Sequence, residues 1–127
     1  CSPAAFFATG ESPSYHAAKG GLLSLTKYLS VIAGKKEIRV NAISPGLIIQ
    51  DNSLDRYNSE NNENYRKICE TYQPMGKVGK EVDVANLINY LISDGSRYIS
   101  GVCINLDGGA TSQDQFYISQ LINNLNK

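Results

Sequence analysis

Apolar side chains recur along the chain in blocks whose spacing predicts four helices and two strands. The longest block covers 18–32, where apolar residues stand three and four positions apart, the spacing of one helix face. Ser12 or Ser14 is expected to cap the start of this helix, and Pro13 suits its first turn. Gly34, followed by two lysines, predicts its end.

The two predicted strands are short, and each is closed by a turn. Residues 38–44 alternate apolar and polar side chains, and Pro45-Gly46 ends the strand. A second apolar run at 102–106 is closed by Asp107-Gly108-Gly109, a turn that could be mistaken for a metal or phosphate loop. Helices between buried strands indicate a parallel sheet covered by helices. Two buried parallel strands need neighbouring strands to form a stable sheet, so we expect further strands upstream of residue 1.

The remaining segments are of two kinds: one is polar, and the others carry apolar residues at helical spacing. Residues 51–64 are rich in Asn, Ser and charge, which predicts an excursion outside the core. Short helices are expected at 65–72 and 83–93, the second with apolar residues on one face. The tail from Gln115 has helical apolar spacing and is expected to form a docking helix.

Composition and charge narrow the classes of function. The chain has 127 residues, enough for one domain, and its net charge of zero argues against a nucleic-acid partner. Three cysteines without a Cys-x-x-Cys pair favour neither disulfides nor a zinc site, so no metal is predicted and a reducing cytoplasm fits best. No apolar run is long enough for a membrane span or signal peptide. The start at Cys-Ser-Pro, without Met, suggests a fragment or a processed product.

Tyr15 and Lys19 form the first candidate for chemistry. Their four-residue spacing puts both side chains on one face near a helix N-terminus. An ammonium group and a helix N-terminus both favour the phenolate form of a tyrosine, which lets it exchange a proton with an alkoxide or alcohol. On spacing alone, a packed tyrosine beside a solvated lysine is the more common explanation of the pair.

Four stretches in order resemble the short-chain dehydrogenase/reductase family. The match begins at the helix Tyr15-His-Ala-Ala-Lys19 and continues through Arg39-Val-Asn-Ala-Ile-Ser-Pro-Gly46, Met75-Gly-Lys-Val-Gly79 and the segment from Asp83 to Asp107-Gly-Gly109. The resemblance implies an α/β fold, the C-terminal part of a doubly wound parallel-sheet Rossmann-type domain whose N-terminal half is absent. Residues 1–111 would form this part, with a substrate lid at 51–72, and 112–127 would be a tail.

The resemblance also implies the catalytic roles. The family places a serine thirteen residues before its tyrosine, which is where Ser2 stands. Ser2 would hydrogen-bond the substrate oxygen, Tyr15 would pass the proton, and Lys19 would bond the nicotinamide ribose. Thr9 and Ser12 are alternatives for the serine, and a polar strand end is the plain explanation of Ser2.

A cofactor segment follows the first predicted strand. In such enzymes this turn meets the nicotinamide of NAD or NADP, which here implicates Pro45, Gly46, Leu47, Ile48 and Gln50, besides Tyr15 and Lys19. Glycine lets a backbone approach a cofactor closely. Gln50 stands where the family often has threonine, so one side-chain contact is in doubt. An ordinary strand-ending turn is the alternative explanation of Pro45-Gly46.

The implied activity belongs to a longer parent protein. The family's glycine-rich phosphate loop is absent from these 127 residues, which alone are expected to be inactive. The parent would transfer a hydride between NAD(P)(H) and a carbonyl or secondary alcohol, as a homodimer or homotetramer built partly on the long helix. A sugar or surface-polysaccharide substrate and a 3-oxoacyl thioester are both candidates. The alternative is a non-catalytic Rossmann-type binding or assembly module.

Overall fold

The long helix begins and ends where the apolar spacing predicts. In the computed structural model, which describes residues 1–125, α1 spans Pro13–Gly34. Ser12 caps it, because its hydroxyl oxygen accepts a hydrogen bond from the Tyr15 N–H at 3.2 Å. The short 3-10 helix η1, Pro3–Ala5, packs against α1. Among the described residues, no helix is long and apolar enough to cross a membrane.

The described chain divides into two units. The first comprises Cys1–Pro45 and Val84–Leu106, and the second comprises Gly46–Asp83 and the chain from Asp107 onward. Each unit contains one pair of parallel strands. The helices α1 and most of α4 belong to the first unit, whereas α2, α3 and α5 belong to the second.

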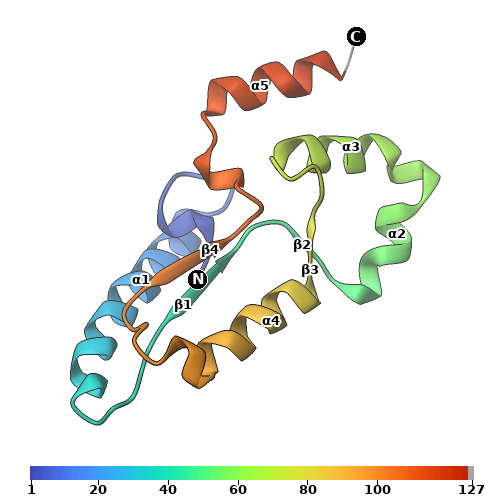
Figure 1. Ribbon diagram of the computed structural model, residues 1–127. Helices are drawn as coiled ribbons and strands as arrows, with labels where there is room; N and C mark the ends of the chain where they lie inside the picture. Colours follow the sequence, from blue (N-terminus) through green and yellow to red (C-terminus); the bar gives the residue numbers. More distant parts are fainter. Residues whose placement is uncertain (126–127) are drawn as a thin grey trace. The chain divides into compact units, whose positions relative to one another are not determined.

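The first unit is built on the parallel pair of β1, Ala42–Pro45, and β4, Cys103–Leu106 (Figure 1). The parallel orientation confirms the prediction, but β1 is shorter than the predicted strand at 38–44. The preceding residues are held by one backbone hydrogen bond, from the Gly101 N–H to the Val40 carbonyl at 2.7 Å, and by side chains. The Val40 N–H donates to the Ser100 hydroxyl at 3.2 Å, and the Asn41 amide donates to the Ile99 carbonyl at 2.8 Å.

Helix α4, Glu81–Ile92, ends in polar contacts that satisfy its last carbonyls. The Arg39 guanidinium donates to the Leu91 carbonyl at 2.6 Å and to the Ser93 carbonyl at 3.2 Å. The buried Ser96 hydroxyl, in η4 (Asp94–Ser96), lies 2.8 Å from the Tyr90 carbonyl. The family-like Arg39 and Ser96 therefore have structural roles at this helix end.

The second unit contains a ladder that the sequence did not predict. It joins β2, Ile48–Ile49, to β3, Gly79–Lys80, in parallel. Two residues are too few to show the alternation that marks a strand. Between these strands the chain forms η2 (Asp51–Ser53), α2 (Leu54–Asn58), η3 (Glu60–Asn62) and α3 (Glu63–Tyr72).

The expected excursion at 51–64 is wrong, because this segment contributes to the core of the second unit. Tyr57 is only 6% exposed and forms a buried cluster with Ile49 and Cys69. Three half-buried side chains pack against the cluster: Leu47, Leu54 and Val78.

The tail forms the predicted docking helix. Helix α5, Gln115–Asn124, packs against α3 and buries Ile118. Asp114 caps its start by accepting from the Tyr117 N–H at 3.2 Å, and the Gln113 amide donates to the Tyr72 carbonyl at 2.8 Å. Residues 126–127 of the predicted tail lie outside the described residues.

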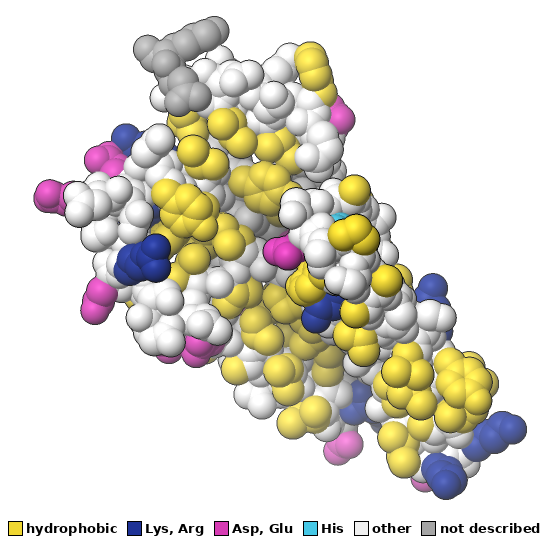
Figure 2. All heavy atoms as spheres, turned by 180° about the vertical axis from the view of Figure 1, so that it is seen from behind, with side chains coloured by type: hydrophobic (Ala, Val, Ile, Leu, Met, Phe, Trp, Pro, Cys, Tyr) yellow, Lys and Arg dark blue, Asp and Glu magenta, His cyan; other side chains and the backbone are white. Residues whose placement is uncertain are grey.

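The apolar face of α1 is largely exposed. Thr26 is the one residue of α1 that is buried. Five apolar side chains of the helix are 43% to 68% exposed: Leu22, Leu25, Tyr28, Val31 and Ile32. Figure 2 shows hydrophobic side chains lying open on the surface. Within residues 1–125, no element of the first unit covers this face.

Candidate active site

Tyr15 and Lys19 lie together on the first turns of α1. The Lys19 ammonium nitrogen is 5.1 Å from the centre of the Tyr15 ring, which is cation–π distance. Both side chains are half-buried. Neither the phenol oxygen nor the ammonium group has a hydrogen-bond partner in the part of the chain that the structure describes. Both groups are therefore available to a ligand.

Ser2 lies in the segment that packs against α1. Its hydroxyl oxygen accepts from the Ala4 N–H at 3.3 Å, so it caps η1 and keeps its own hydrogen for donation. The neighbouring Cys1 thiol donates to the Lys19 carbonyl at 3.6 Å. These contacts hold the segment that carries Ser2 beside the turn that carries Lys19.

Thr9 and Ser12, the alternatives to Ser2, are already engaged through His16. The Thr9 N–H donates to His16 Nε2 at 2.9 Å, and His16 Nδ1 lies 2.9 Å from the Ser12 carbonyl. A backbone N–H can only donate and a carbonyl can only accept, so the ring proton is on Nδ1. The Thr9 hydroxyl also contacts His16, while the Ser12 hydroxyl caps α1. His16 thus stabilises the loop of residues 9–12, which precedes α1.

Gly46 begins the second unit, directly after Pro45 ends β1. A Cβ atom on Gly46 would lie 2.7 Å from the Asp107 Cβ and 2.8 Å from its Cα, closer than side chains approach. Glycine is therefore required for packing against Asp107, whether or not a cofactor approaches. The sequence indicated a cofactor contact or a strand-ending turn at Gly46, and neither predicts this contact with Asp107.

The following residues of the predicted cofactor segment form β2 and the turn after it. The Leu47 carbonyl accepts from the Gly79 N–H at 3.0 Å. The Ile48 side chain packs closely on Gly79, where a Cβ would lie 2.5 Å from Ile48 Cδ1. Gln50 is exposed, and its side chain makes no capping bond to η2. Of these residues, Gln50 offers the polar side chain that a ligand could use.

The turn at Asp107-Gly108-Gly109 is confirmed as a structural turn. Gly108 and Gly109 have φ values of +59° and +86°, which favour glycine. The Asp107 carboxylate accepts from the Gly109 N–H at 2.9 Å and the Thr111 N–H at 3.0 Å. Burial opposes ionisation of Asp107, but these bonds and one from the Thr111 hydroxyl outweigh it and lower the pKa of Asp107. The carboxylate locks the turn.

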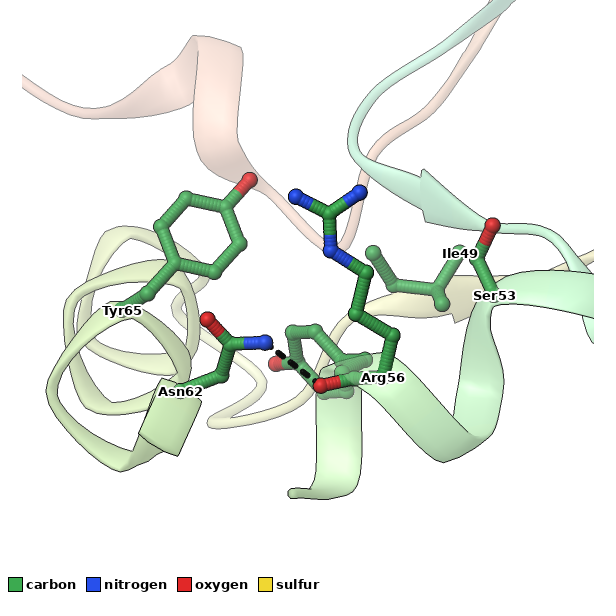
Figure 3. A pocket seen from close by; sticks show the side chains of 6 residues that line it. Ile49, Ser53, Arg56, Asn62 and Tyr65 are labelled. Carbon is green, nitrogen blue, oxygen red and sulfur yellow. Dashed lines mark hydrogen bonds between the residues drawn. The ribbon is translucent and has the colours of Figure 1, made fainter. Parts of the chain in front are cut away.

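A pocket of about 430 Å³ opens in the second unit, within the predicted lid. Its wall consists of six residues: Ile49, Ser53, Arg56, Tyr57, Asn62 and Tyr65 (Figure 3). The sequence showed that this segment is rich in Asn, Ser and charge but did not single out Arg56. The isolated positive charge between an aspartate and a tyrosine was the only available signal.

Comparisons with known proteins agree with this arrangement. Residues 2–111 match a protein-family model described as enoyl-(acyl carrier protein) reductase. The 7alpha-hydroxysteroid dehydrogenase of Bacteroides fragilis is 41% identical over 97 residues, which are 76% of this chain and 36% of that protein. This chain therefore spans well under half of that relative.

Two solved structures share the fold. One is a short chain dehydrogenase family protein from Francisella tularensis, with a TM-score of 0.73 and 31% identity over 88% of this chain and 49% of that one. The other is a 4-hydroxyisoleucine dehydrogenase complexed with NADH and succinate, with a TM-score of 0.73 and 33% identity over 89% of this chain and 44% of that one. The α/β fold is the Rossmann-type fold of these structures. The chain belongs to the short-chain dehydrogenase/reductase family.

Proposed function

We propose that the protein, at the full length that its gene encodes, transfers a hydride between NAD(H) or NADP(H) and a carbonyl or secondary alcohol. The observation that carries this proposal is the Tyr15–Lys19 pair, a phenol and an ammonium group on adjacent turns with no partner among residues 1–125. Membership in a family of dehydrogenases and reductases supports it.

Three side chains share the work in this proposal: Ser2 and Tyr15 have one task each, and Lys19 has two. The Ser2 hydroxyl donates to the substrate oxygen, and the Tyr15 hydroxyl gives its proton to the alkoxide that forms on reduction. The Lys19 ammonium favours the resulting phenolate and donates to a ribose hydroxyl. In the oxidative direction, the Tyr15 phenolate takes the alcohol proton. A bound nicotinamide supplies or accepts the hydride.

The residues present fit the nicotinamide end of the cofactor. Lys19 offers ammonium hydrogens, and the exposed Gln50 amide offers a donor and an acceptor. Pro45, Gly46, Leu47 and Ile48 would present their backbone to the carboxamide. The Leu47 carbonyl is occupied by Gly79, so other groups of this segment would make the polar contact. In this proposal, the glycine-rich loop of the full-length protein would bind the pyrophosphate.

The substrate would be a hydroxylated compound or the matching ketone, bound partly by residues 51–72. The 7alpha-hydroxysteroid dehydrogenase and 4-hydroxyisoleucine dehydrogenase, by their names, support hydroxylated substrates. A similar protein that is named 3-oxoacyl-[acyl-carrier-protein] reductase, 38% identical over 96 residues, supports a 3-oxoacyl thioester as the second candidate. The sugar or surface-polysaccharide substrate stays a prediction.

The wider organisation is also part of the proposal. Residues 1–111 would be the C-terminal half of one dinucleotide-binding domain, with 112–127 as its tail. The exposed apolar side chains of α1 would be covered in a homodimer or homotetramer. Three free cysteines support a reducing compartment, the cytoplasm.

Cofactor binding tests the proposal without knowledge of the substrate. We expect NADH or NADPH at 100 times its Kd to raise the melting temperature of the full-length protein by about 5 °C. Lys19→Met should reduce this shift, whereas Lys27→Met, an exposed lysine of the same helix, should preserve it. The measurement is a thermal-shift titration. Absence of any shift with either cofactor would favour the non-catalytic module.

A further inference from the structure

The only histidine of the sequence, His16, follows Tyr15 directly on α1 and uses both of its ring nitrogens to bond one loop. We propose that His16 is a positioning residue for Tyr15 and that its neutral form is required, so that protonation of the ring releases the loop of residues 9–12 and slows catalysis. This inference deepens the proposed function and rests on the role that it gives to Tyr15.

Both ends of the loop are bonded to His16. At its start, the Thr9 N–H donates to His16 Nε2 at 2.9 Å, and the Thr9 hydroxyl lies 3.2 Å from the same nitrogen. At its end, the Ser12 carbonyl accepts from His16 Nδ1 at 2.9 Å and from the His16 backbone N–H at 3.2 Å. One half-buried residue therefore closes the loop.

The loop has little else to hold it. In the part of the chain that the structure describes, its one further internal hydrogen bond joins the Glu11 N–H to the Thr9 hydroxyl at 3.3 Å. A Cβ atom on Gly10 would meet no atom within 4 Å, so the middle of the loop packs against nothing. The conformation of the loop therefore depends on the bonds to His16.

Ser12 connects this loop to Tyr15. It is the N-cap of α1, and its hydroxyl oxygen accepts from the Tyr15 N–H at 3.2 Å. An N-cap residue satisfies a backbone donor of the first helical turn only while its own backbone stays extended, as it does here with φ −64° and ψ 154°. Because His16 holds the Ser12 carbonyl, it also holds the cap of the turn that carries Tyr15.

Only one form of the His16 ring satisfies these contacts, the neutral form with its proton on Nδ1. The cation places a second N–H opposite the Thr9 N–H, and two donors cannot bond each other. A positive charge near the N-terminus of a helix is also unfavourable. Histidine is the side chain that changes charge between about pH 5 and 8, so mild acid is sufficient to break the bond to Thr9.

The titratable groups beside His16 come from the loop and from α1. Glu11 is the only acidic or basic side chain between residues 2 and 14, so η1, which packs against α1, contributes none. On the helix, Tyr15 and Lys19 contact each other. Within residues 1–125, no ion pair joins His16 to Glu11. A proton on His16 therefore gains no carboxylate partner that offsets the lost bond.

The pH dependence of carbonyl reduction by the full-length protein tests the inference. In this direction Tyr15 gives up a proton, so its own titration favours low pH, and a rate that falls on acidification reports another group. We expect kcat for reduction of ethyl acetoacetate by NADH or NADPH to fall about fivefold from about pH 8 to about pH 5.5, the effect of one lost hydrogen bond. A rate that does not fall would overturn the inference.

Three variants distinguish positioning by a neutral ring from a merely structural role. His16→Gln keeps a donor and an acceptor without a charge change, so it should retain most of the rate at pH 8 and lose the fall in acid. His16→Ala loses both ring bonds and should lower kcat about tenfold at either pH. Glu11→Gln should keep the wild-type profile. The same fall in His16→Gln as in the wild type would contradict the inference.

An NMR measurement, which needs no substrate, separates the inference from the proposed function. Long-range ¹H–¹⁵N spectra of the full-length protein at pH 8 should show His16 with its proton on Nδ1. Acidification should lower the protection factor of the Tyr15 amide in hydrogen exchange, and His16→Gln should prevent this loss. A proton on Nε2, or constant protection, would contradict the inference. If both signals are as expected but no ketone is reduced, the His16 contacts stand and the proposed function fails.

Discussion

Replacing Tyr15 by phenylalanine in the full-length protein is expected to lower kcat about 1,000-fold, within the range for removal of a general acid or base. The phenylalanine ring keeps the surface on which the Lys19 ammonium lies, 5.1 Å from the ring centre. Only the hydroxyl that exchanges the proton is lost. Cofactor affinity should therefore change little, and steady-state kinetics with a parallel cofactor titration will measure both quantities.

Tyr28 provides the matched control for this substitution. It lies on the same helix, is 64% exposed, and its hydroxyl has no hydrogen-bond partner in the described part of the chain. Tyr28→Phe should leave kcat unchanged. If Tyr15→Phe also leaves kcat unchanged, Tyr15 is a packed surface residue and its spacing from Lys19 is a coincidence.

Asp107→Ala is expected to reduce the free energy of unfolding at pH 7 by about 3 kcal/mol, the value of its charge-assisted hydrogen bonds. The carboxylate is 9% exposed and binds the backbone N–H groups of Gly109 and Thr111. Its loss leaves Gly109 without this acceptor in a turn that has positive φ values. Urea unfolding of the full-length protein will measure the change, with the exposed Asp94→Ala as control.

The Asp107 effect should depend on pH in a defined direction. Because the folded protein lowers the pKa of Asp107, the unfolded chain binds this proton more readily. The stabilisation is therefore fully present above the ordinary value of 3.8 and is lost as the pH falls through the lowered value. The difference in stability between wild type and Asp107→Ala should narrow below about pH 4. A difference that stays constant down to pH 2 would show that packing, and not the charge, stabilises the turn.

The longer helices were predictable from the sequence because their apolar pattern repeats over several turns. Helix α1 carries several turns of apolar spacing and a cap at Ser12, and α5 carries three turns. The ladder of β2 and β3 has two residues per strand and shows no period. Tyr57 stands in a polar stretch, and its burial depends on Ile49 and Cys69, which only the folded chain brings to it.

In the candidate site too, only the features that depend on local spacing were predictable from the sequence. Tyr15 and Lys19 are neighbours on one helix, so local spacing was sufficient to pair them. The contact of Gly46 with Asp107 joins distant parts of the chain, and no local pattern reports it. Arg56 resembles any surface charge in a polar segment. Only the folded chain shows that it lines a pocket with Ile49 and Tyr65.

The central claim is that the protein transfers a hydride to a carbonyl carbon, and isotope transfer tests it most directly. Full-length protein is incubated with NADH or NADPH deuterated at C4 of the nicotinamide, together with a panel of ketones and 3-oxoacyl thioesters, and the products are analysed by mass spectrometry. We predict one deuterium on the new carbinol carbon, a product that Tyr15→Phe forms far more slowly. Reduction without deuterium on that carbon, or no reduction with any carbonyl compound, would contradict the account.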